Sequence, residues 1–446
     1  MRGRLQLKGA IVIGSEQLRI LLAQATGISQ LGLPASLAVD LIYRILFAEG
    51  DVNVTRISEI THLFPQVIDE IMSDLQHDHM VEVVKASALR ISYTYRLTDE
   101  GANRARDALE RTQYIGPFPV DIDAYREALL LQTAAHQKLA PTEVKQALSH
   151  LTLPENFHRR IGPAVNANSS LFLYGPPGNG KTTVAHAIAQ LLAGTDPIWL
   201  PYAISIGGQI VQIYDPLVHQ YFLPPESETP TGKTGYIGVD KRWGLFKRPA
   251  VMVGGELTME ALDLRFEPIT KIYEAPLQMK ANGGMFLIDD FGRQQMSPQH
   301  LLNRWIVPLE THIDYLRLQS GQTLEVPFRQ LIVFATNLDP SDLVDSAFLR
   351  RIQMKVELGP PDEKMFYQIF MQMCQTLGVP FDRSGFLHLL QKWYRDAKRP
   401  LQAVHPRDLL RTLNAICEYE GAMPLMSAEL LDEACSCYFV DTATPV

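Results

Sequence analysis

The segment at residues 175–183 constrains this chain more than any other. An apolar run typical of a buried strand (171–174) precedes it, and a helical pattern (184–192) follows it. Glycines let main-chain N–H groups wrap phosphates, a lysine reaches the β and γ phosphates, a threonine hydroxyl binds Mg²⁺, and a helix N-terminus favours an anion. The sequence therefore predicts a nucleotide phosphate site made of Gly175, Pro176, Pro177, Gly178, Asn179, Gly180, Lys181, Thr182 and Thr183.

A second apolar strand pattern, at 285–288, ends in two acids, Asp289 and Asp290. A strand of this kind places both carboxylates at the carboxyl edge of a sheet, beside the phosphate loop. Asp289 is predicted to hold Mg²⁺ together with Thr182, and Asp290 to orient or deprotonate an attacking water. Alone the pattern is common, and its pairing with the loop makes it specific.

Three further polar positions follow in the chain. A third strand pattern, at 331–336, ends at Asn337, which is predicted to position water near the γ-phosphate. An Arg350-Arg351 pair follows an apolar stretch, and Arg407 lies in a helical region nearer the C-terminus. Planar guanidinium groups stabilise charge on a transferring phosphate.

In this order the motifs resemble the AAA+ ATPases. The resemblance covers about residues 155–440, with Walker A at 175–182, Walker B at 285–290 and sensor 1 at Asn337. It also implies an arginine finger at Arg350 or Arg351 and sensor 2 at Arg407. The family implies ATP and Mg²⁺ as cofactors, ATP hydrolysis, and a homo-oligomeric ring that we expect to be hexameric.

Two features refine the resemblance. Alternation around Ser320-Gly321 just before the third strand predicts a hairpin, which with 281–284 resembles the pre-sensor-1 hairpin group of the family. Most of the superfamily has Asp-Glu in Walker B, whereas this chain has Asp289-Asp290, as initiator and helicase-loader relatives do. The shorter acid leaves open a slow, nucleotide-gated scaffold as an alternative to fast turnover.

About 90 residues separate the Walker A helix from Walker B, more than a minimal crossover needs. They include a hairpin pattern at 202–214, a polar loop at 224–235 and a hairpin-like pattern at 262–275. Phe266 and Tyr273 near that last tip either grip a substrate in a ring pore or pack beneath the insertion. Packing is the favoured interpretation.

Residues 30–115 show a different pattern, of helices followed by two extended stretches and a closing helix. An apolar helix (36–47), two helical stretches from Thr55 and Phe64, and extended stretches at 80–84 and 91–96 precede a helix capped by Thr98. This order resembles a winged helix-turn-helix module.

Charge decides what such a module docks. Residues 1–120 hold 12 Lys plus Arg and 14 Asp plus Glu, a net charge of −2. No cation occurs between Ile57 and Val84, the span of the expected recognition helix, and only Lys85, Arg90 and Arg96 make the wing basic. Phosphate contacts dominate DNA affinity. The pattern favours protein docking and disfavours DNA, which stays open as an alternative.

Composition sets the remaining limits. The 446 residues predict two to three domains, and the net charge of −8 argues against a general nucleic-acid coat. No apolar run is long enough for a membrane span, so we expect no membrane insertion. The four cysteines show no zinc spacing and predict buried free thiols in a reducing, cytoplasmic compartment; they are Cys374, Cys417, Cys435 and Cys437.

The sequence thus predicts an α/β P-loop NTPase (AAA+) core with a parallel sheet, a C-terminal α-helical lid and an N-terminal winged-helix-like α+β domain. The expected boundaries are 30–115 for the winged-helix-like domain, 116–152 for a helical connector, 153–358 for the ATPase core and 359–446 for the lid. The expected function is ATP-driven remodelling of a protein client, with the N-terminal domain as adaptor. The alternatives are a DNA-acting motor or regulator of transcription or replication, and a slow nucleotide-gated scaffold.

Overall fold

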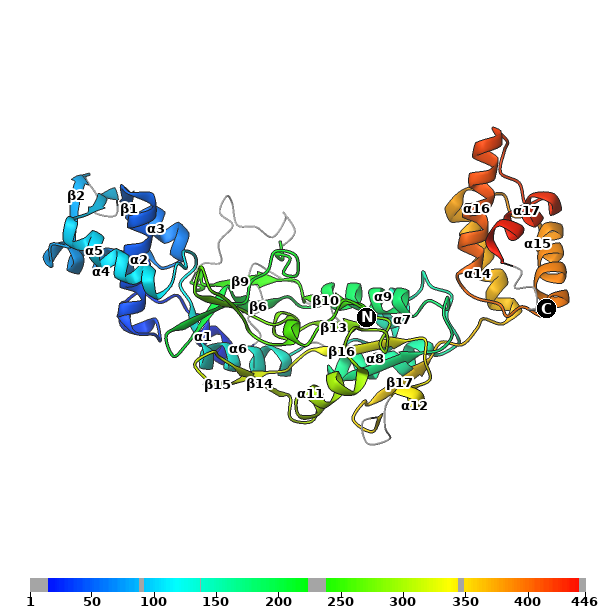
Figure 1. Cartoon of the computed structure of the whole chain (residues 1–446), viewed down its shortest axis with the longest axis horizontal. Helices are drawn as coiled ribbons and strands as arrows, with labels where there is room; N and C mark the ends of the chain where they lie inside the picture. Colours follow the sequence, from blue (N-terminus) through cyan, green and yellow to red (C-terminus); the bar gives the residue numbers. More distant parts are fainter. Residues whose placement is uncertain (1–14, 88–91, 137, 224–237, 344–348, 441–446) are drawn as a thin grey trace, which may run out of the picture. The chain divides into compact units, whose positions relative to one another are not determined.

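The computed structural model describes residues 15–87, 92–136, 138–223, 238–343 and 349–440 (Figure 1). The chain forms two compact units. One contains Met1–Lys138, Leu192–Phe286 and His300–Leu331, and the other contains Leu139–Leu191, Leu287–Gln299 and Ile332–Val446. Each unit is therefore assembled from segments that are distant in sequence. The expected polar loop at 224–235 and residues 346–348 before Arg350 lie outside the described residues.

The N-terminal module of the first unit has the element order expected for residues 30–115. A small antiparallel sheet has the strand order β1-β3-β2, with helices before and after its hairpin. Its elements are α2 (Ala35–Glu49), β1 (Val52–Asn53), α3 (Val54–Thr61), α4 (Pro65–His77), β2 (Val81–Lys85), β3 (Thr94–Leu97) and α5 (Asp99–Arg111), preceded by α1 (Glu16–Leu21) and η1 (Ile28–Gln30).

Local chemistry explains the helix boundaries of this module. The side chain of Asn53 accepts a hydrogen bond from the N–H of Arg56 at the start of α3, and Thr98 does the same for Gly101 at the start of α5. Pro65 occupies the first turn of α4, where its missing N–H costs nothing. The Thr98 cap that the sequence predicted is confirmed.

A second, five-stranded sheet of this unit has the order β11-β12-β8-β7-β4. The predicted hairpin at 202–214 is present as β7 and β8. Residues 120–121 form β4 beside β7, so the stretch expected to be a purely helical connector also contributes a strand. The elements are β4 (Val120–Asp121), α6 (Ile122–Ala134), β7 (Ala203–Ile206), β8 (Gln209–Gln212), β11 (Arg265–Glu267) and β12 (Ile272–Glu274).

The tip residues Phe266 and Tyr273 face each other across the β11–β12 register. Tyr273 is only 3% exposed, and its hydroxyl accepts a hydrogen bond of 3.0 Å from the N–H of Gln319. A side chain held in this way cannot grip a substrate, so the pore interpretation is wrong for Tyr273. The packing interpretation is the correct one.

The predicted hairpin before the sensor strand is also present. β14 (Ile313–Arg317) pairs antiparallel with β15 (Thr323–Pro327), with Leu316 opposite Leu324 on the buried face. The other elements of this part of the chain are β6 (Ile198–Pro201), β9 (Trp243–Phe246), β10 (Ala250–Val253), η4 (Glu260–Leu262), α10 (Leu277–Lys280) and α11 (Pro298–Thr311).

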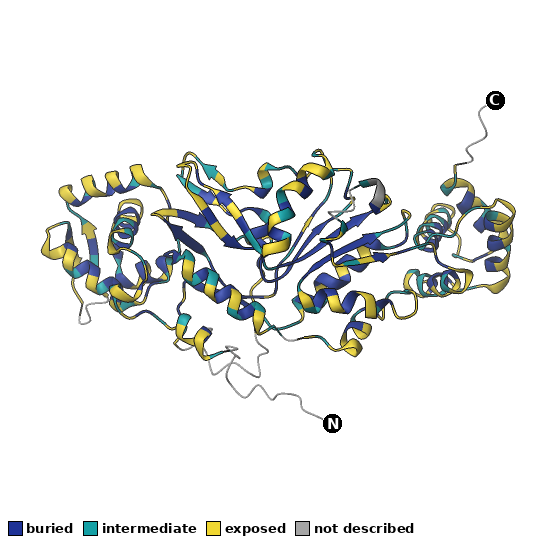
Figure 2. Ribbon diagram, turned by 90° about the horizontal axis from the view of Figure 1, so that it is seen from below, coloured by how far each residue is buried: buried dark blue, intermediate teal, exposed yellow. Residues whose placement is uncertain are grey.

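The sheet that carries the phosphate loop has the order β10-β13-β16-β5-β17. Both neighbours of β5 run parallel to it, with Phe334 and Lys355 opposite Phe172. Every residue of β13 and β16 is buried, and Figure 2 shows these strands dark blue beneath helices with exposed outer faces. Strands buried on both faces are typical of a parallel sheet covered by helices.

The elements of this second unit are arranged around β5 and its loop. They are α7 (Pro141–Ala147), α8 (Phe157–Ala167), β5 (Ser170–Tyr174), α9 (Lys181–Ala193), β13 (Met285–Ile288), β16 (Leu331–Thr336), α12 (Pro340–Leu343) and β17 (Met354–Glu357).

The C-terminal region is helical, as predicted, and has its own apolar core. It consists of α14 (Glu363–Leu377), α15 (Arg383–Leu389), η5 (Leu390–Asp396), α16 (His405–Glu420) and α17 (Ala428–Tyr438). The expected breaks at 378–380 and 398–400 are present, but η5 is a π-helix that the sequence pattern did not indicate. Three of the four free cysteines are buried, whereas Cys437 is exposed and corrects the expectation for that residue. Within the described residues, no helix has the length and apolar character needed to cross a bilayer.

Candidate functional site

The phosphate loop lies between β5 and α9, at the carboxyl edge of the sheet. Gly175 has φ 134°, and a Cβ there would lie 2.4 Å from the carbonyl oxygen of Leu358. Gly178 and Gly180 also have positive φ, at 77° and 86°. Side chains would be strained at all three positions, so the glycines of the motif are required by the backbone itself.

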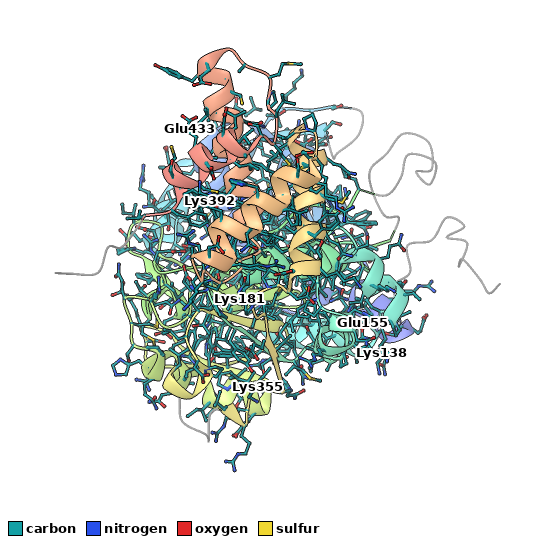
Figure 3. The ribbon with its side chains drawn as sticks, turned by 90° about the vertical axis from the view of Figure 1, so that its right-hand side faces the viewer. Lys138, Glu155, Lys181, Lys355, Lys392 and Glu433 are labelled. Carbon is teal, nitrogen blue, oxygen red and sulfur yellow. The ribbon has the colours of Figure 1, made fainter. Side chains whose placement is uncertain are left out.

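Lys181 begins α9 and folds back over the loop (Figure 3). Its Nζ donates hydrogen bonds of 2.8 Å to the carbonyl oxygen of Gly175 and 2.9 Å to that of Pro176. Burial lowers the pKa of Lys181, and the nearby carboxylates of Asp289 and Asp290 oppose this shift. The ammonium group is thus held between the loop and the paired acids.

Thr182 connects the loop to β13. Its Oγ1 donates a 2.8 Å hydrogen bond to Oδ2 of Asp289, which follows the buried strand β13. The other carboxylate oxygen of Asp289 accepts a 3.0 Å hydrogen bond from the N–H of Asp290. The two residues predicted to bind a metal ion are therefore adjacent.

Asp290 and Asn337 are adjacent because β16 lies between β5 and β13 in the sheet. The side-chain amide of Asn337, just after β16, donates a 3.0 Å hydrogen bond to Oδ1 of Asp290. Asp290 has φ 49°, in the left-handed region where aspartate and asparagine are enriched among non-glycine residues. This backbone conformation is a physical reason for the short acid at a position where relatives have glutamate.

Sequence reasoning missed one residue that fixes the acidic turn. Nε2 of Gln294 donates to the carbonyl oxygens of Asp289 and Asp290, at 3.0 and 3.1 Å, and its Oε1 accepts from the N–H of Gly292. Gln294 therefore orients the Walker B turn. A glutamine four residues after two acids is not a motif, so the sequence gave no signal for this role.

The helical region contacts the phosphate loop through the segment before α16. The N–H of Val404 donates a 2.8 Å hydrogen bond to the carbonyl of Gly178, and the N–H of Ala403 donates to Oδ1 of Asn179 at 3.3 Å. Arg407 lies in the first turn of α16, where its Nε donates to Asp408 at 2.8 Å. The predicted sensor 2 residue is thus three positions from a direct contact with the loop.

Arg350 and Arg351 are placed elsewhere. Both precede β17, and the main-chain carbonyl of Arg351 accepts a 3.3 Å hydrogen bond from Ser170, the first residue of β5. Because β17 runs parallel to β5, this is the amino edge of the sheet, opposite the phosphate loop. The five residues of β5 span roughly 16 Å at 3.3 Å per residue. The two arginines are therefore separate from the loop of their own chain.

The residues at the carboxyl edge fit a nucleotide phosphate chain and Mg²⁺. Positive-φ glycines, a helix N-terminus and Lys181 supply the donors for phosphate. Among the residues that the structure describes, no three His, Cys, Asp or Glu side chains gather as a dedicated metal cage. Mg²⁺ is usually held by one or two carboxylates together with substrate phosphates, a need that Thr182 and Asp289 can meet.

A glycine loop between a buried strand and a helix, with its lysine and paired acids at one sheet edge, defines a P-loop nucleotide-binding protein. Residues 171–213 match the family described as "ATPase family associated with various cellular activities (AAA)". The match and the site together make the chain an AAA+ ATPase. Residues 362–437 match a domain of unknown function, DUF8689, and no curated protein matches the chain.

Three solved structures resemble the chain at low identity. Two are single-residue mutants of RuvB from Thermotoga maritima, at 14% and 15% identity with TM-scores of 0.36 and 0.37. They match 68% and 65% of this chain and 73% and 70% of those chains. NtrX from Brucella abortus has 13% identity and a TM-score of 0.35 over 74% of this chain and 60% of that one. Scores this low say nothing about what this chain acts on.

Proposed function

We propose that this chain is a Mg²⁺-dependent AAA+ ATPase that forms a ring and couples ATP binding and hydrolysis to remodelling of a protein partner. The observation that carries the ATPase part is the run of hydrogen bonds from Thr182 to Asp289 and from Asn337 to Asp290. It joins three separate segments at the edge where the phosphate loop lies. Hydrolysis needs such a cluster, because phosphoryl transfer depends on positioning and charge stabilisation.

Each group has a distinct role in this proposal. The glycine-loop N–H groups and Lys181 bind the phosphates, and Thr182 and Asp289 hold Mg²⁺, which neutralises phosphate charge when bound. The Asp290 carboxylate orients the attacking water and accepts its proton, and Asn337 fixes that carboxylate. Arg407, in the first turn of α16, reports nucleotide occupancy to the helical lid.

Ring formation is the part of the proposal that depends on Arg350 and Arg351. These residues lie at the sheet edge opposite the loop of their own chain, so a role in hydrolysis requires the site of a neighbouring copy. A guanidinium group supplied in this way stabilises charge on the transferring phosphate. The alternative is a local structural role, which one of the two arginines is expected to have.

Charge on the N-terminal module supports a protein client over DNA. The solvent face of α4, the helix in the expected recognition position, carries Glu70, Asp74 and Asp78. On the wing, Arg96 is held by Asp51 through two hydrogen bonds of 2.6 and 2.7 Å. That pair removes a cation that the wing would need for phosphate contacts. We therefore propose that residues 30–115 are a winged-helix-like adaptor for protein, with 116–152, 153–358 and 359–446 as connector, ATPase core and lid.

The test is to measure ATP hydrolysis by the full chain alone, with duplex DNA, and with proteins that co-purify with an Asp290→Asn variant loaded with ATP. Stimulation by a co-purifying protein supports the proposal. Stimulation by DNA, with salt-sensitive binding to it, supports the DNA-acting alternative instead. A Lys181→Ala chain should trap neither.

A second candidate function, a nucleotide-gated scaffold with slow turnover, is favoured by Asp290 in place of glutamate. It predicts ATP binding and ATP-dependent assembly with almost no hydrolysis. A basal turnover within the usual enzymatic range of about 1 per second or faster contradicts it. The free thiols of the chain support a reducing, cytoplasmic setting for either function.

A further inference from the structure

A cavity of about 210 Å³ lies in the first unit, between the N-terminal module and the turn that joins β7 to β8. All of its lining residues belong to that unit, and none belongs to the ATP site. One wall is apolar and is formed by Leu37, Leu41 and Phe118. The rest carries charge, which is what makes the cavity chemically specific.

Arg44, on α2, is the buried cation of this cavity. It is 2% exposed, and its Nε and Nη1 donate hydrogen bonds of 3.1 Å to the carbonyl oxygens of Asp40 and Thr112. Both acceptors are neutral, whereas a buried guanidinium is stabilised best by an anion. Burial lowers the pKa of Arg44 to about 10; the Asp40 carboxylate opposes this shift and Arg111 adds to it.

The only carboxylate among the lining residues is engaged elsewhere. Asp40 accepts hydrogen bonds from Arg111 at both oxygens, at 2.7 and 3.1 Å. Lys271 is the third cation of the lining, and its Nζ donates to the main-chain carbonyl of Glu110. Three cations and one carboxylate leave the lining with a net charge of +2.

The shape of the cavity depends on the β7–β8 turn. Gly207 and Gly208 have φ 55° and 83°, and nothing lies within 4 Å of the place where a Cβ of Gly208 would be. Two consecutive left-handed residues require glycine and keep this wall free of side chains. The turn therefore borders the cavity with main chain alone.

We propose that this cavity binds a small organic anion, whose carboxylate or phosphate group lies against Arg44 and Lys271 and whose apolar part lies against Leu41 and Phe118. An engineered apolar cavity of about 150 Å³ holds one benzene molecule, so a cavity of 210 Å³ accepts a ligand slightly larger than a single ring. A complete nucleotide is too large. The ligand contacts α2, α5 and the β7–β8 turn together and thereby stabilises the contact between the module and the sheet.

The experiment is isothermal titration calorimetry on the full chain carrying Lys181→Ala, so that the nucleotide loop does not contribute anion binding. The probes are phenyl phosphate, benzoate and inorganic phosphate, with benzyl alcohol as the neutral counterpart. We expect phenyl phosphate, benzoate or both to bind at least about tenfold more tightly than benzyl alcohol, with affinity that falls as salt is added. Preference for phenyl phosphate or for benzoate identifies which anionic group the ligand carries.

Two substitutions test the site in opposite directions. Lys271→Met should weaken anion binding by about tenfold, and Asp40→Asn should tighten it several-fold because the lining loses its only negative charge and frees Arg111. The matched control is Arg104→Met, which removes an exposed cation of α5 outside the cavity. Arg44→Met is unsuitable as the decisive variant because the side chain is buried in the fold.

The proposal is overturned if none of the anions binds, if benzyl alcohol binds as tightly as benzoate, or if Asp40→Asn weakens binding in a chain whose melting temperature is unchanged. A merely structural role for these cations predicts lower stability in Asp40→Asn and no gain in affinity. Binding by all anions that Lys271→Met and Arg104→Met reduce equally would also contradict the site, since it would reflect general surface charge.

Discussion

The hydroxyl of Thr182 lies 2.8 Å from Oδ2 of Asp289, although the two residues are 107 positions apart in the chain. Thr182 lies in the first turn of α9, and Asp289 follows β13. A hydroxyl and a carboxylate at this separation can share one divalent cation with substrate phosphates. The contact therefore determines where the metal-dependent chemistry of the chain takes place.

The first prediction concerns this contact. Thr182→Ala removes the hydroxyl and should lower the rate of Mg²⁺-dependent ATP hydrolysis by about 100-fold or more, because one metal ligand is lost. Thr182→Ser is the matched control, since it keeps the hydroxyl and should retain most of the rate. Steady-state ATPase assays across a Mg²⁺ titration measure both. Equal rates in the two variants would remove Thr182 from the metal site.

The second prediction concerns Lys181. Lys181→Ala should abolish ATP binding while leaving the fold intact, because the ammonium group contacts loop carbonyls and faces the acids, and does not pack into the core. Fluorescent-nucleotide titration measures binding, and thermal melting followed by circular dichroism measures folding. Lys392→Ala, on the helical lid, is the control and should bind ATP normally. Unchanged ATP affinity in Lys181→Ala would reject the assignment.

The third prediction concerns contact between the loop and the lid. A Cβ at Gly178 would lie 2.8 Å from both the Gln402 side chain and the Val404 side chain, and the residue has φ 77°. Gly178→Ala should therefore weaken ATP binding by displacing the segment before α16, at a cost of about 1–3 kcal/mol. Gly359→Ala is the control, because nothing lies near its Cβ position. Nucleotide titration compares the two, and equal affinities would contradict the steric argument.

The fourth prediction concerns Arg350 and Arg351. If one of them acts in a neighbouring copy, the double Arg→Ala chain and the Lys181→Ala chain should each be inactive alone, and their mixture should recover part of the ATPase rate. Recovery arises at interfaces where an intact phosphate loop meets an intact arginine. The rate is measured against mixing ratio. Full activity of the double variant alone would exclude the role.

The sequence predicted the local features of this fold well, because they depend on neighbouring residues. The glycine loop, the Thr98 cap and the hairpin before β16 each need only a short segment to form. The strand at 120–121 was not predictable, since two residues become a strand only when β7 supplies the hydrogen bonds. The π-helix η5 has the same amphipathic pattern as an α-helix and gave no separate signal.

The candidate site divides in the same way. Lys181, Thr182, Asp289 and Asn337 each follow a recognisable strand, so their convergence could be predicted from parallel topology. Gln294 could not, because its role depends on the path of the turn after β13. The contact of Val404 with Gly178 was equally hidden, since main-chain hydrogen bonds between distant segments leave no pattern in residue type.

The lid offers a prediction about pH. Asp432, on α17, accepts hydrogen bonds from Lys392 at 2.8 Å, from Trp393 at 2.6 Å and from His388 at 3.0 Å. Burial raises the pKa of Asp432, but these three donors outweigh it and lower the pKa to about 2. The ionised carboxylate therefore holds α17 against α15 and η5.

A lowered folded-state pKa gives stability that is present above the unfolded pKa of about 4 and is lost as pH falls through about 2. Asp432→Asn should thus reduce the free energy of unfolding by about 1–2 kcal/mol at pH 7, after allowance for partial exposure. The difference from the unmodified chain should shrink steadily between pH 4 and pH 2. Glu433→Gln, on the exposed side of the same helix and labelled in Figure 3, is the control and should show no such difference. Urea unfolding followed by circular dichroism at each pH measures the effect, and a difference that stays constant down to pH 2 would show that the carboxylate charge is not its cause.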